Sequence, residues 1–289
     1  MGIYISKNEM QITATHEGKQ RLCNVARQNY ILADKSCRTN QPELEKLTAR
    51  HIDTYSLEKP PPVVVPHKDF YNYVNEEDGN PKLWVSFANK YLGGGFLEWG
   101  YVQEEIICLE FYEMATHILE NGIPLMAKKE AYLFTNLLRT SIADPQYYGK
   151  CDDAVLFQPS SIATAHFLSI DALKRPNRDA DYTYGELNHL CVKSLCGFSG
   201  CVERNLTSIN TGNWGAGVFR NKHEVVYFIQ ILSAWLAGVK EIHFWGYLEE
   251  VGDAVVRLVE ESSNVQEFFT KGMQLLHLGD HSMYELYRI

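Results

Sequence analysis

Two adjacent acids, Glu104 and Glu105, stand shortly after three consecutive glycines, Gly93 to Gly95, with seven residues between the last glycine and Gln103. Neighbouring carboxylates in a partly buried place repel each other, which raises the pKa of one of them. A carboxyl group that keeps its proton near neutral pH can donate it to a leaving oxygen, as glycosidic chemistry requires. The alternative is a solvated first helical turn, where the helix dipole favours negative charge.

A second glycine-rich segment, Thr211 to Phe219, has the sequence TGNWGAGVF. Glycine permits positive φ and a close backbone approach, so successive N–H groups can point at an anion. Neither segment matches the P-loop or the dinucleotide-binding pattern, and tight turns are the alternative for each. Two such loops in one α/β chain favour ligand binding. Anion-binding loops combined with acid chemistry on a sugar indicate an ADP-ribosyl substrate.

Both glycine segments must be positioned by strands and helices. The apolar run Leu83–Ala88 and the segments 161–173, 206–210 and 240–245 predict strands. The apolar spacing from Gln103 predicts one helix that stops at Gly122 and Pro124, and further helices are expected over 223–238 and 253–262. This alternation predicts an α/β fold in which helices cover both faces of a mixed or parallel sheet.

The first 62 residues are polar and weakly periodic, and they are predicted to be a mainly helical extension with helices over 18–34 and 40–53. The proline-rich segment 58–69 is expected to be an extended connector, because proline restricts itself and its predecessor to β or polyproline geometry. We therefore divide the chain into an extension, residues 1–62, and a catalytic domain, residues 63–289.

The overall composition narrows the functional class. The formal net charge is −9 and no stripe of Lys and Arg occurs, so we expect no sequence-specific nucleic-acid binding. No apolar run approaches eighteen residues, and the N-terminal residues lack the pattern of a signal peptide. The seven dispersed cysteines form no C-x-x-C pair, so buried reduced thiols are favoured over a metal site. We expect an intracellular protein, cytoplasmic or nuclear, without a metal or cofactor.

The spacing G-G-G-x₇-Q-E-E within the segment FANKYLGGGFLEWGYVQEEI resembles the motif of poly(ADP-ribose) glycohydrolases. The resemblance continues in IDALKRPNRDADYTYGELNHLCVKSLCGF and in TGNWGAGVF followed by IQILSAW, and it spans roughly residues 74–250. It implies a macrodomain-like three-layer α/β/α sandwich with a mixed central sheet. It also implies hydrolysis of ribose–ribose O-glycosidic bonds in poly(ADP-ribose), with ADP-ribose as the product and no cofactor. A monomer and no membrane partner are expected.

By the same resemblance, Glu105 is expected to be the catalytic acid, which protonates the leaving ribose hydroxyl and then activates water. Glu104 and Asn89 are expected to hold the hydroxyls of the reacting ribose, and Glu76 to accept from the adenine amino group. The backbone of the triple glycine would lie over the ribose and the adjacent phosphate. The remaining residues expected at the substrate are Gly93, Gly94, Gly95, Gln103, Gly212, Asn213, Trp214, Gly215, Ala216, Gly217, Val218, Phe219 and, against adenine, Trp245.

The chain departs from the family pattern at Ser86, where animal members have Asp. The tyrosine that larger members place over the site has no obvious counterpart, and the aromatic residues of 144–150 are expected to pack within the protein. Two alternatives stay open: a hydrolase of mono-ADP-ribose on protein or DNA, and a binding module that reads ADP-ribose without cleaving it. Retention of both glutamates favours an enzyme.

Overall fold

The structure is a computed structural model that describes residues 12–15, 17–33, 40–73, 82–98, 100–143, 148–149 and 157–288, with the backbone alone over 157–163. Within these residues one seven-stranded sheet has the order β1-β4-β5-β3-β6-β7-β2. The strands are β1 Glu43–Thr48, β2 Val63–His67, β3 Lys82–Ala88, β4 Glu130–Ala143, β5 Phe157–Asp171, β6 Ser208–Gly212 and β7 Glu241–Trp245. The β1–β4 and β4–β5 pairs are antiparallel and the others are parallel, so the predicted mixed sheet is confirmed.

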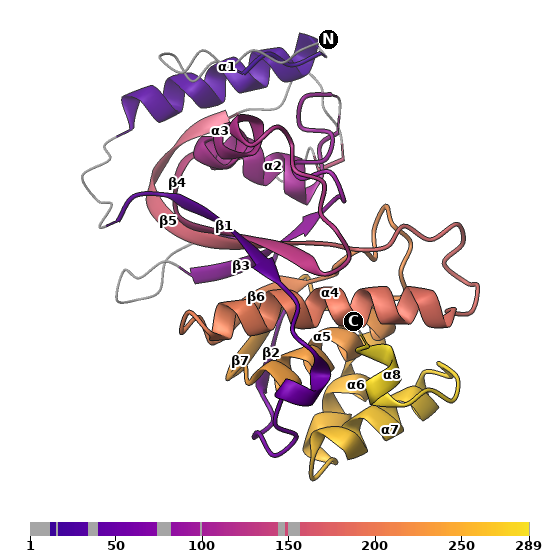
Figure 1. The fold of residues 1–289 in the computed structure, drawn as a ribbon. Helices are drawn as coiled ribbons and strands as arrows, with labels where there is room; N and C mark the ends of the chain where they lie inside the picture. The colour runs from indigo at the N-terminus through magenta and orange to yellow at the C-terminus, as the bar shows by residue number, and fades with distance from the viewer. Residues whose placement is uncertain are drawn as a thin grey trace.

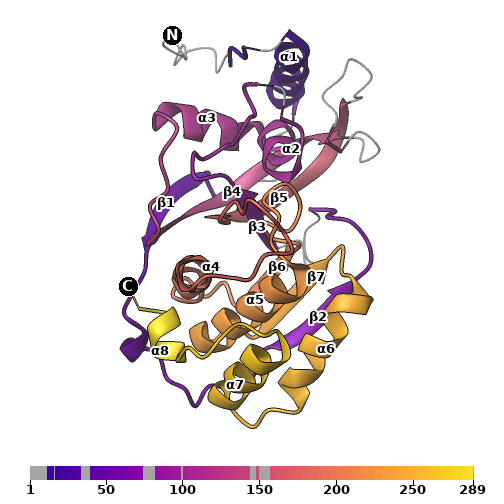
Figure 2. The same ribbon diagram turned by 90° about the vertical axis from the view of Figure 1, so that its right-hand side faces the viewer.

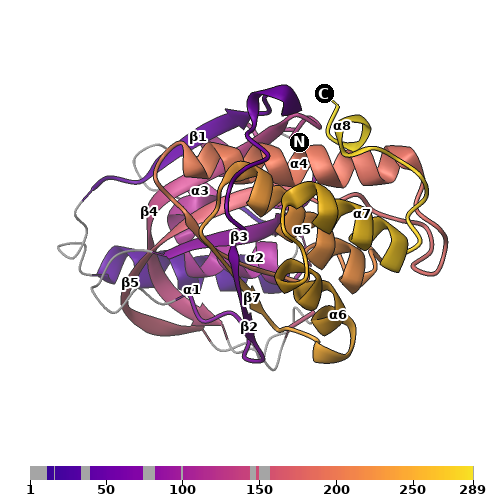
Figure 3. The ribbon, with the colours of Figure 1, turned by 90° about the horizontal axis from the view of Figure 1, so that it is seen from below.

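Helices cover both faces of this sheet (Figures 1 and 2). One face carries α1 Glu17–Leu32, α2 Gln103–Glu110 and α3 Tyr112–Glu120. The opposite face, seen from below in Figure 3, carries α4 Tyr184–Val202, α5 His223–Ala237, α6 Glu249–Glu260, α7 Val265–Leu275 and the short α8 Met283–Leu286. Each face has its own buried apolar cluster, so the sheet separates two cores. No helix in the described part of the chain is long and apolar enough to cross a bilayer.

Several elements follow directly from their sequence patterns. The strands predicted at 83–88, 206–210 and 240–245 appear as β3, β6 and β7. The helix α5 is buried along most of its length and ends at Gly238, which has a φ of 85°, as expected of a helix that stops at a glycine. The helix predicted from Gln103 is broken into α2 and α3 at Phe111, whose φ and ψ are −111° and 74°.

The helix predicted over 40–53 is wrong. Its residues form β1 and a single 3₁₀ turn, Ile52–Thr54. The side chain of Leu47 is buried against the α4 face, and the backbone of β1 pairs with β4 from Glu43 to Thr48. Tertiary pairing therefore overrides the helix-forming tendency of a Glu- and Lys-rich segment. The structure thus places a strand from the predicted extension in the same sheet as the rest of the chain.

The proline-rich connector is extended as predicted, and part of it is the edge strand β2, which pairs in parallel with β7. Pro66 lies within β2. A proline has no N–H to donate to a ladder, and an edge strand leaves one side unpaired, so the position suits it.

Candidate active site

The parallel strands β3, β5, β6 and β7 end at the same edge of the sheet, and both glycine segments start there. A cavity of about 460 Å³ lies at this edge. Ligands of open α/β sheets bind in this position, outside the carboxyl ends of the strands. The lining residues are Phe87, Asn89, Gly95, Glu98, Gly100, Tyr101, Val102, Gln103, Glu104, Glu105, Tyr148, Gly149, Ala172, Lys174, Asn213, Gly215, Gly217, Val218 and Phe219.

Glu104 is fixed by two backbone N–H groups. Its Oε1 accepts from Gly93 at 2.6 Å and its Oε2 accepts from Asn89 at 2.8 Å. Burial, and then the charge of Glu105, raises the pKa of the Glu104 carboxyl well above its usual range, although the two N–H groups oppose the shift. The predicted first-turn acid is therefore a buried group, and the solvated surface turn is excluded.

Glu105 faces the cavity beside Glu104 and is 6% exposed. Its Oε1 accepts from Gly95 N–H at 2.9 Å and its Oε2 from Val102 N–H at 3.0 Å. The second bond ties the side chain back to the residue that precedes α2, as in a capping box. The carboxylate is thereby oriented by the glycine segment on one side and by the start of its own helix on the other.

The triple glycine encloses the two carboxylates. Gly94 has a φ of 55°, and a Cβ atom there would lie 2.6 Å from Glu104 Oε2 and from Glu105 Oε1. All three glycine N–H groups donate within the protein, because that of Gly94 bonds Tyr91 O at 3.0 Å while its neighbours bond the two acids. The glycines therefore make room for the acids and leave no N–H of their own for an anion.

Gln103 joins α2 to β3. Its Oε1 accepts from Phe87 N–H at 2.7 Å and its Nε2 donates to Val85 O at 2.9 Å, so both polar ends of the side chain are used within the fold. Gln103 is expected at the substrate, and it does line the cavity. Its side-chain amide also fixes the position of α2 relative to β3.

The second glycine segment forms the opposite wall. Trp214 is fully buried and donates from Nε1 to Ile170 O at 3.1 Å, and Gly215 has a φ of 69°. No described residue accepts a hydrogen bond from the N–H groups of Gly217, Val218 and Phe219, which line the cavity. Three free N–H groups in succession suit an anionic ligand.

A second cavity of about 290 Å³ adjoins the first and shares Gln103 and Tyr148 with it. Its wall includes the aromatic rings of Phe70, Tyr71 and Tyr73. Tyr148, expected to pack within the protein, instead lies on the wall of both cavities and is 40% exposed. No spacing in the sequence connects this tyrosine with the acids, since only the fold brings them together.

Six residues expected at the substrate do not line the first cavity, namely Gly93, Gly94, Gly212, Trp214, Ala216 and Trp245. Trp245 does not line either cavity: its ring stacks on His67 at 4.1 Å and its Nε1 donates to Asn210 Oδ1. Ser86 is fully buried, pairs with Ser169 of β5 in the sheet register, and is absent from the cavity walls. Glu76 lies outside the described residues.

Comparisons with known proteins show one family of relatives. Residues 68–250 match the family described as "Poly (ADP-ribose) glycohydrolase (PARG), Macro domain fold". Poly(ADP-ribose) glycohydrolase 2 of Caenorhabditis elegans is 26% identical over 169 residues, which are 53% of this chain and 35% of that protein. Poly(ADP-ribose) glycohydrolase 1 of Arabidopsis thaliana is 31% identical over 136 residues, which are 44% of this chain and 23% of that protein.

A solved structure of poly(ADP-ribose) glycohydrolase from Deinococcus radiodurans in complex with ADP-ribose is similar at a TM-score of 0.46 and 14% identity, covering 83% of this chain and 96% of that one. The enzyme from Thermomonospora curvata is similar at a TM-score of 0.45 and 14% identity, covering 71% and 79%.

The two helical layers around a mixed sheet define a macrodomain-type α/β protein, as expected. The matched residues 68–250 include both glycine segments and both acids, and the chain belongs to the poly(ADP-ribose) glycohydrolase family. It spans about a third or less of the length of the curated relatives named above.

Proposed function

We propose that the protein is a glycohydrolase that cleaves ribose–ribose O-glycosidic bonds of poly(ADP-ribose) and releases ADP-ribose. One observation carries the proposal: two carboxylates, held by backbone N–H groups, form one wall of a cavity whose opposite wall offers free N–H groups to an anion. The acid pair can protonate a glycosidic oxygen of the ribose, and the N–H groups can bind the anionic diphosphate. The arrangement therefore fits an ADP-ribosyl unit.

In the proposed reaction, protonated Glu105 gives its proton to the oxygen of the leaving ribose as the C1′–O bond breaks. The reacting ribose becomes oxocarbenium-like, and the Glu105 carboxylate then takes a proton from the water that attacks C1′. Glu104 and Asn89 hold the ribose hydroxyls. The buried position of Glu104 and its raised pKa support a polar but weakly solvated environment for this step.

The rest of the ligand has two places to lie. The diphosphate would take the N–H groups of Gly217 to Phe219, with Lys174, whose side chain is exposed, at the same cavity. The adenine would take the second cavity, where Phe70, Tyr71 and Tyr148 supply aromatic surface, in place of the expected Trp245. Stacking on aromatic rings is the usual way in which proteins hold a base.

The protein is proposed to act as an intracellular monomer. The described cysteines, Cys23, Cys108, Cys191, Cys196 and Cys201, are buried and free, which suits a reducing compartment.

The decisive experiment compares the wild-type protein with Glu105→Gln on poly(ADP-ribose) and on mono-ADP-ribosylated protein, with released ADP-ribose as the readout. We expect release from the polymer and a loss of about 10²–10⁴-fold in the variant, as is typical of general acid–base catalysis. Cleavage of the mono-modified substrate alone would overturn the polymer assignment. If the protein binds ADP-ribose but releases none from either substrate, it is a binding module and not an enzyme.

A further inference from the structure

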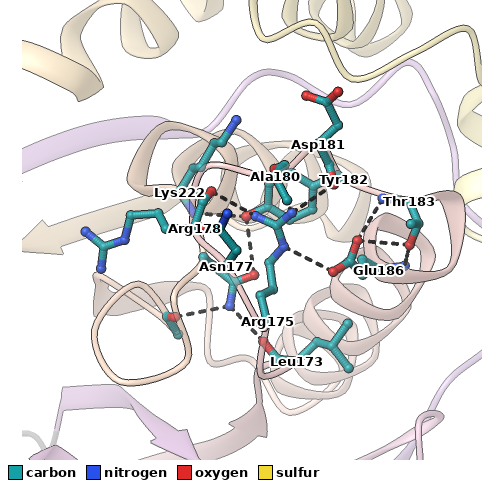
Figure 4. A network of polar contacts seen from close by, with 12 residues as sticks. Leu173, Arg175, Asn177, Arg178, Ala180, Asp181, Tyr182, Thr183, Glu186 and Lys222 are labelled. Atoms are coloured by element: carbon teal, nitrogen blue, oxygen red, sulfur yellow. Dashed lines mark hydrogen bonds and ion pairs between the residues drawn. The ribbon is translucent and has the colours of Figure 1, made fainter.

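A buried arginine organises the loop that follows β5 (Figure 4). Arg175 is 1% exposed. Its Nε donates to Glu186 Oε1 at 3.1 Å, and its Nη2 donates to Ala180 O at 2.8 Å and Asp181 O at 2.9 Å. A third carbonyl, that of Arg178, accepts from Nη1, so the guanidinium draws the loop over 173–183 around itself.

The same guanidinium lies 3.7 Å above the ring of Tyr182, which connects this loop to the anion-binding wall. The Tyr182 hydroxyl accepts from Lys222 N–H at 2.9 Å and donates to Asn221 Oδ1 at 3.3 Å. Asn221 in turn donates from Nδ2 to Leu173 O at 2.9 Å and to Gly215 O at 3.1 Å. The two loops are therefore joined through side chains that Arg175 holds in place.

Three further hydrogen bonds to backbone carbonyls reinforce the connection. The backbone N–H of Arg175 donates to Phe219 O at 2.9 Å. The side chain of Arg178 donates to Ala216 O, and Nη1 of Arg220 donates to Pro176 O at 2.6 Å. The segment 213–222 lies outside every helix and strand. Its first residues are anchored elsewhere, because Asn213 donates to Gly246 O and Trp214 donates to Ile170 O. The residues from Ala216 to Arg220 instead bond to the 173–183 loop, so the orientation of the free N–H groups between them depends on the loop that Arg175 shapes.

We propose that Arg175 is a positioning residue for ligand binding: it fixes the 173–183 loop, and through it aims the N–H groups of Gly217 to Phe219 and the side chain of Lys174 at the anionic part of the ligand. Arg175 itself does not line the cavity, and its contacts do not include Glu104 or Glu105. It therefore acts on binding and leaves the acid pair in place. The identity of the ligand rests on the proposed function, whereas the role of Arg175 in fixing the 173–183 loop does not.

The test uses Arg175→Lys and Arg175→Met, with Arg204→Lys as the matched control. Arg204 is also an arginine that pairs with a glutamate, Glu45, and donates to a carbonyl, that of Gly200, but it lies outside the cavity. A lysine keeps the charge but cannot reach several carbonyls at once, so Arg175→Lys should give only partial rescue.

Hydrogen exchange on the ligand-free protein tests the control of the loop. We expect the amides of Ala216, Asn221 and Lys222 to exchange about tenfold faster in both Arg175 variants, the effect of one lost hydrogen bond to a charged group, while the amides of α4 and α5 keep their rates. Unchanged exchange at these three amides would overturn the proposal. Faster exchange throughout α4 and α5 would also overturn it, because Arg175 would then act on overall stability.

Ligand measurements test the consequence. The dissociation constant for ADP-ribose should rise at least about tenfold in Arg175→Met and less in Arg175→Lys. KM for the polymer should rise likewise, with kcat within about threefold of wild type, because the acid pair is untouched. A tenfold fall in kcat with an unchanged KM would contradict a positioning role in binding. A wild-type protein that binds ADP-ribose but cleaves nothing would refute the proposed activity and still allow the binding and exchange comparisons.

Discussion

Gly94 shows at the scale of a single residue why the glycine segment precedes the acids. Its φ of 55° is unfavourable for other residues, and the two carboxylate oxygens that a Cβ atom would meet at 2.6 Å are each fixed by backbone N–H groups. The acids can move away only by losing these bonds. Position 94 thus requires glycine for two reasons: its backbone has a positive φ, and two carboxylates lie too close for a Cβ atom.

Gly94→Ala should lower activity by about 10²-fold or more, since displacing a catalytic group by about an ångström has that effect. The matched control is Gly122→Ala. Gly122 has a similar φ of 72°, but a Cβ atom there would meet nothing within 4 Å. Both variants should lose about 1 kcal/mol of unfolding free energy from the left-handed backbone conformation, and only Gly94→Ala should lose activity. Equal turnover by the two variants would show that the crowding at the acids has no catalytic effect.

The sequence singled out the acid pair and both glycine segments, and the structure places residues of all three at one cavity. Each segment is close in sequence to a strand that positions it, whereas the roles expected of these residues rest on the family resemblance. Tyr148 and Arg175 could not be found in this way. Tyr148 is distant from the acids in the sequence and yet lines the same cavity, and Arg175 bonds to carbonyl groups, which any residue type can present.

At the scale of elements, α1 supports the loop between the glycines and the acids. Lys19 is fully buried on α1, donates to Gly100 O, and lies 5.3 Å from the ring centre of Tyr101. Thr15, just before the helix, donates from its N–H to Leu97 O at 2.8 Å. A Cβ atom at Gly100 would lie 3.0 Å from Glu105 Oε1, so the supported loop is directly beside the second acid.

Lys19→Met should therefore reduce stability and activity together. It leaves the Gly100 carbonyl without its charged donor, which should lower the free energy of unfolding by about 1–3 kcal/mol. Arg21→Met on the same helix is the control, because Arg21 makes an exposed i,i+4 contact with Glu17 and should change stability by less than about 1 kcal/mol. Urea unfolding and polymer turnover measure both effects. A Lys19 variant that matches Arg21→Met in both would refute a supporting role for α1.

The elements that escaped prediction have irregular patterns. In β4 the pairing register with β5 shifts between Phe134 and Leu137 and again between Arg139 and Ser141, so the two-residue alternation of a strand is interrupted. The N-terminus of α4 carried a readable signal, because Thr183 and Glu186 form a capping box. The break at Phe111 had no such signal, since the apolar spacing continues through it and every residue on that face is buried.

At the scale of the whole molecule, the sheet separates two cores, and the cavity beside the acid pair shares no lining residue with a polar cavity of about 350 Å³. The polar cavity is lined by Glu43, Glu45, Arg204 and His166, among others. His166 Nδ1 accepts from Asn136 N–H at 3.0 Å, which requires a neutral ring. Burial lowers the pKa of His166 to about 4. The free energy of unfolding should therefore respond to a proton that binds outside the cavity of the acid pair.

The sign of this response follows from proton linkage. Between pH 6.5 and 4 the unfolded chain binds a proton at His166 that the folded protein does not, so the contribution of the neutral ring is complete above pH 6.5 and is lost as the pH falls. His166→Gln keeps an acceptor for Asn136 N–H without titrating. We expect its unfolding free energy to fall less steeply than that of wild type, by up to about 3 kcal/mol over this range. Urea unfolding at pH 7, 6, 5 and 4 measures the difference, and parallel curves would mean that His166 titrates alike in both states.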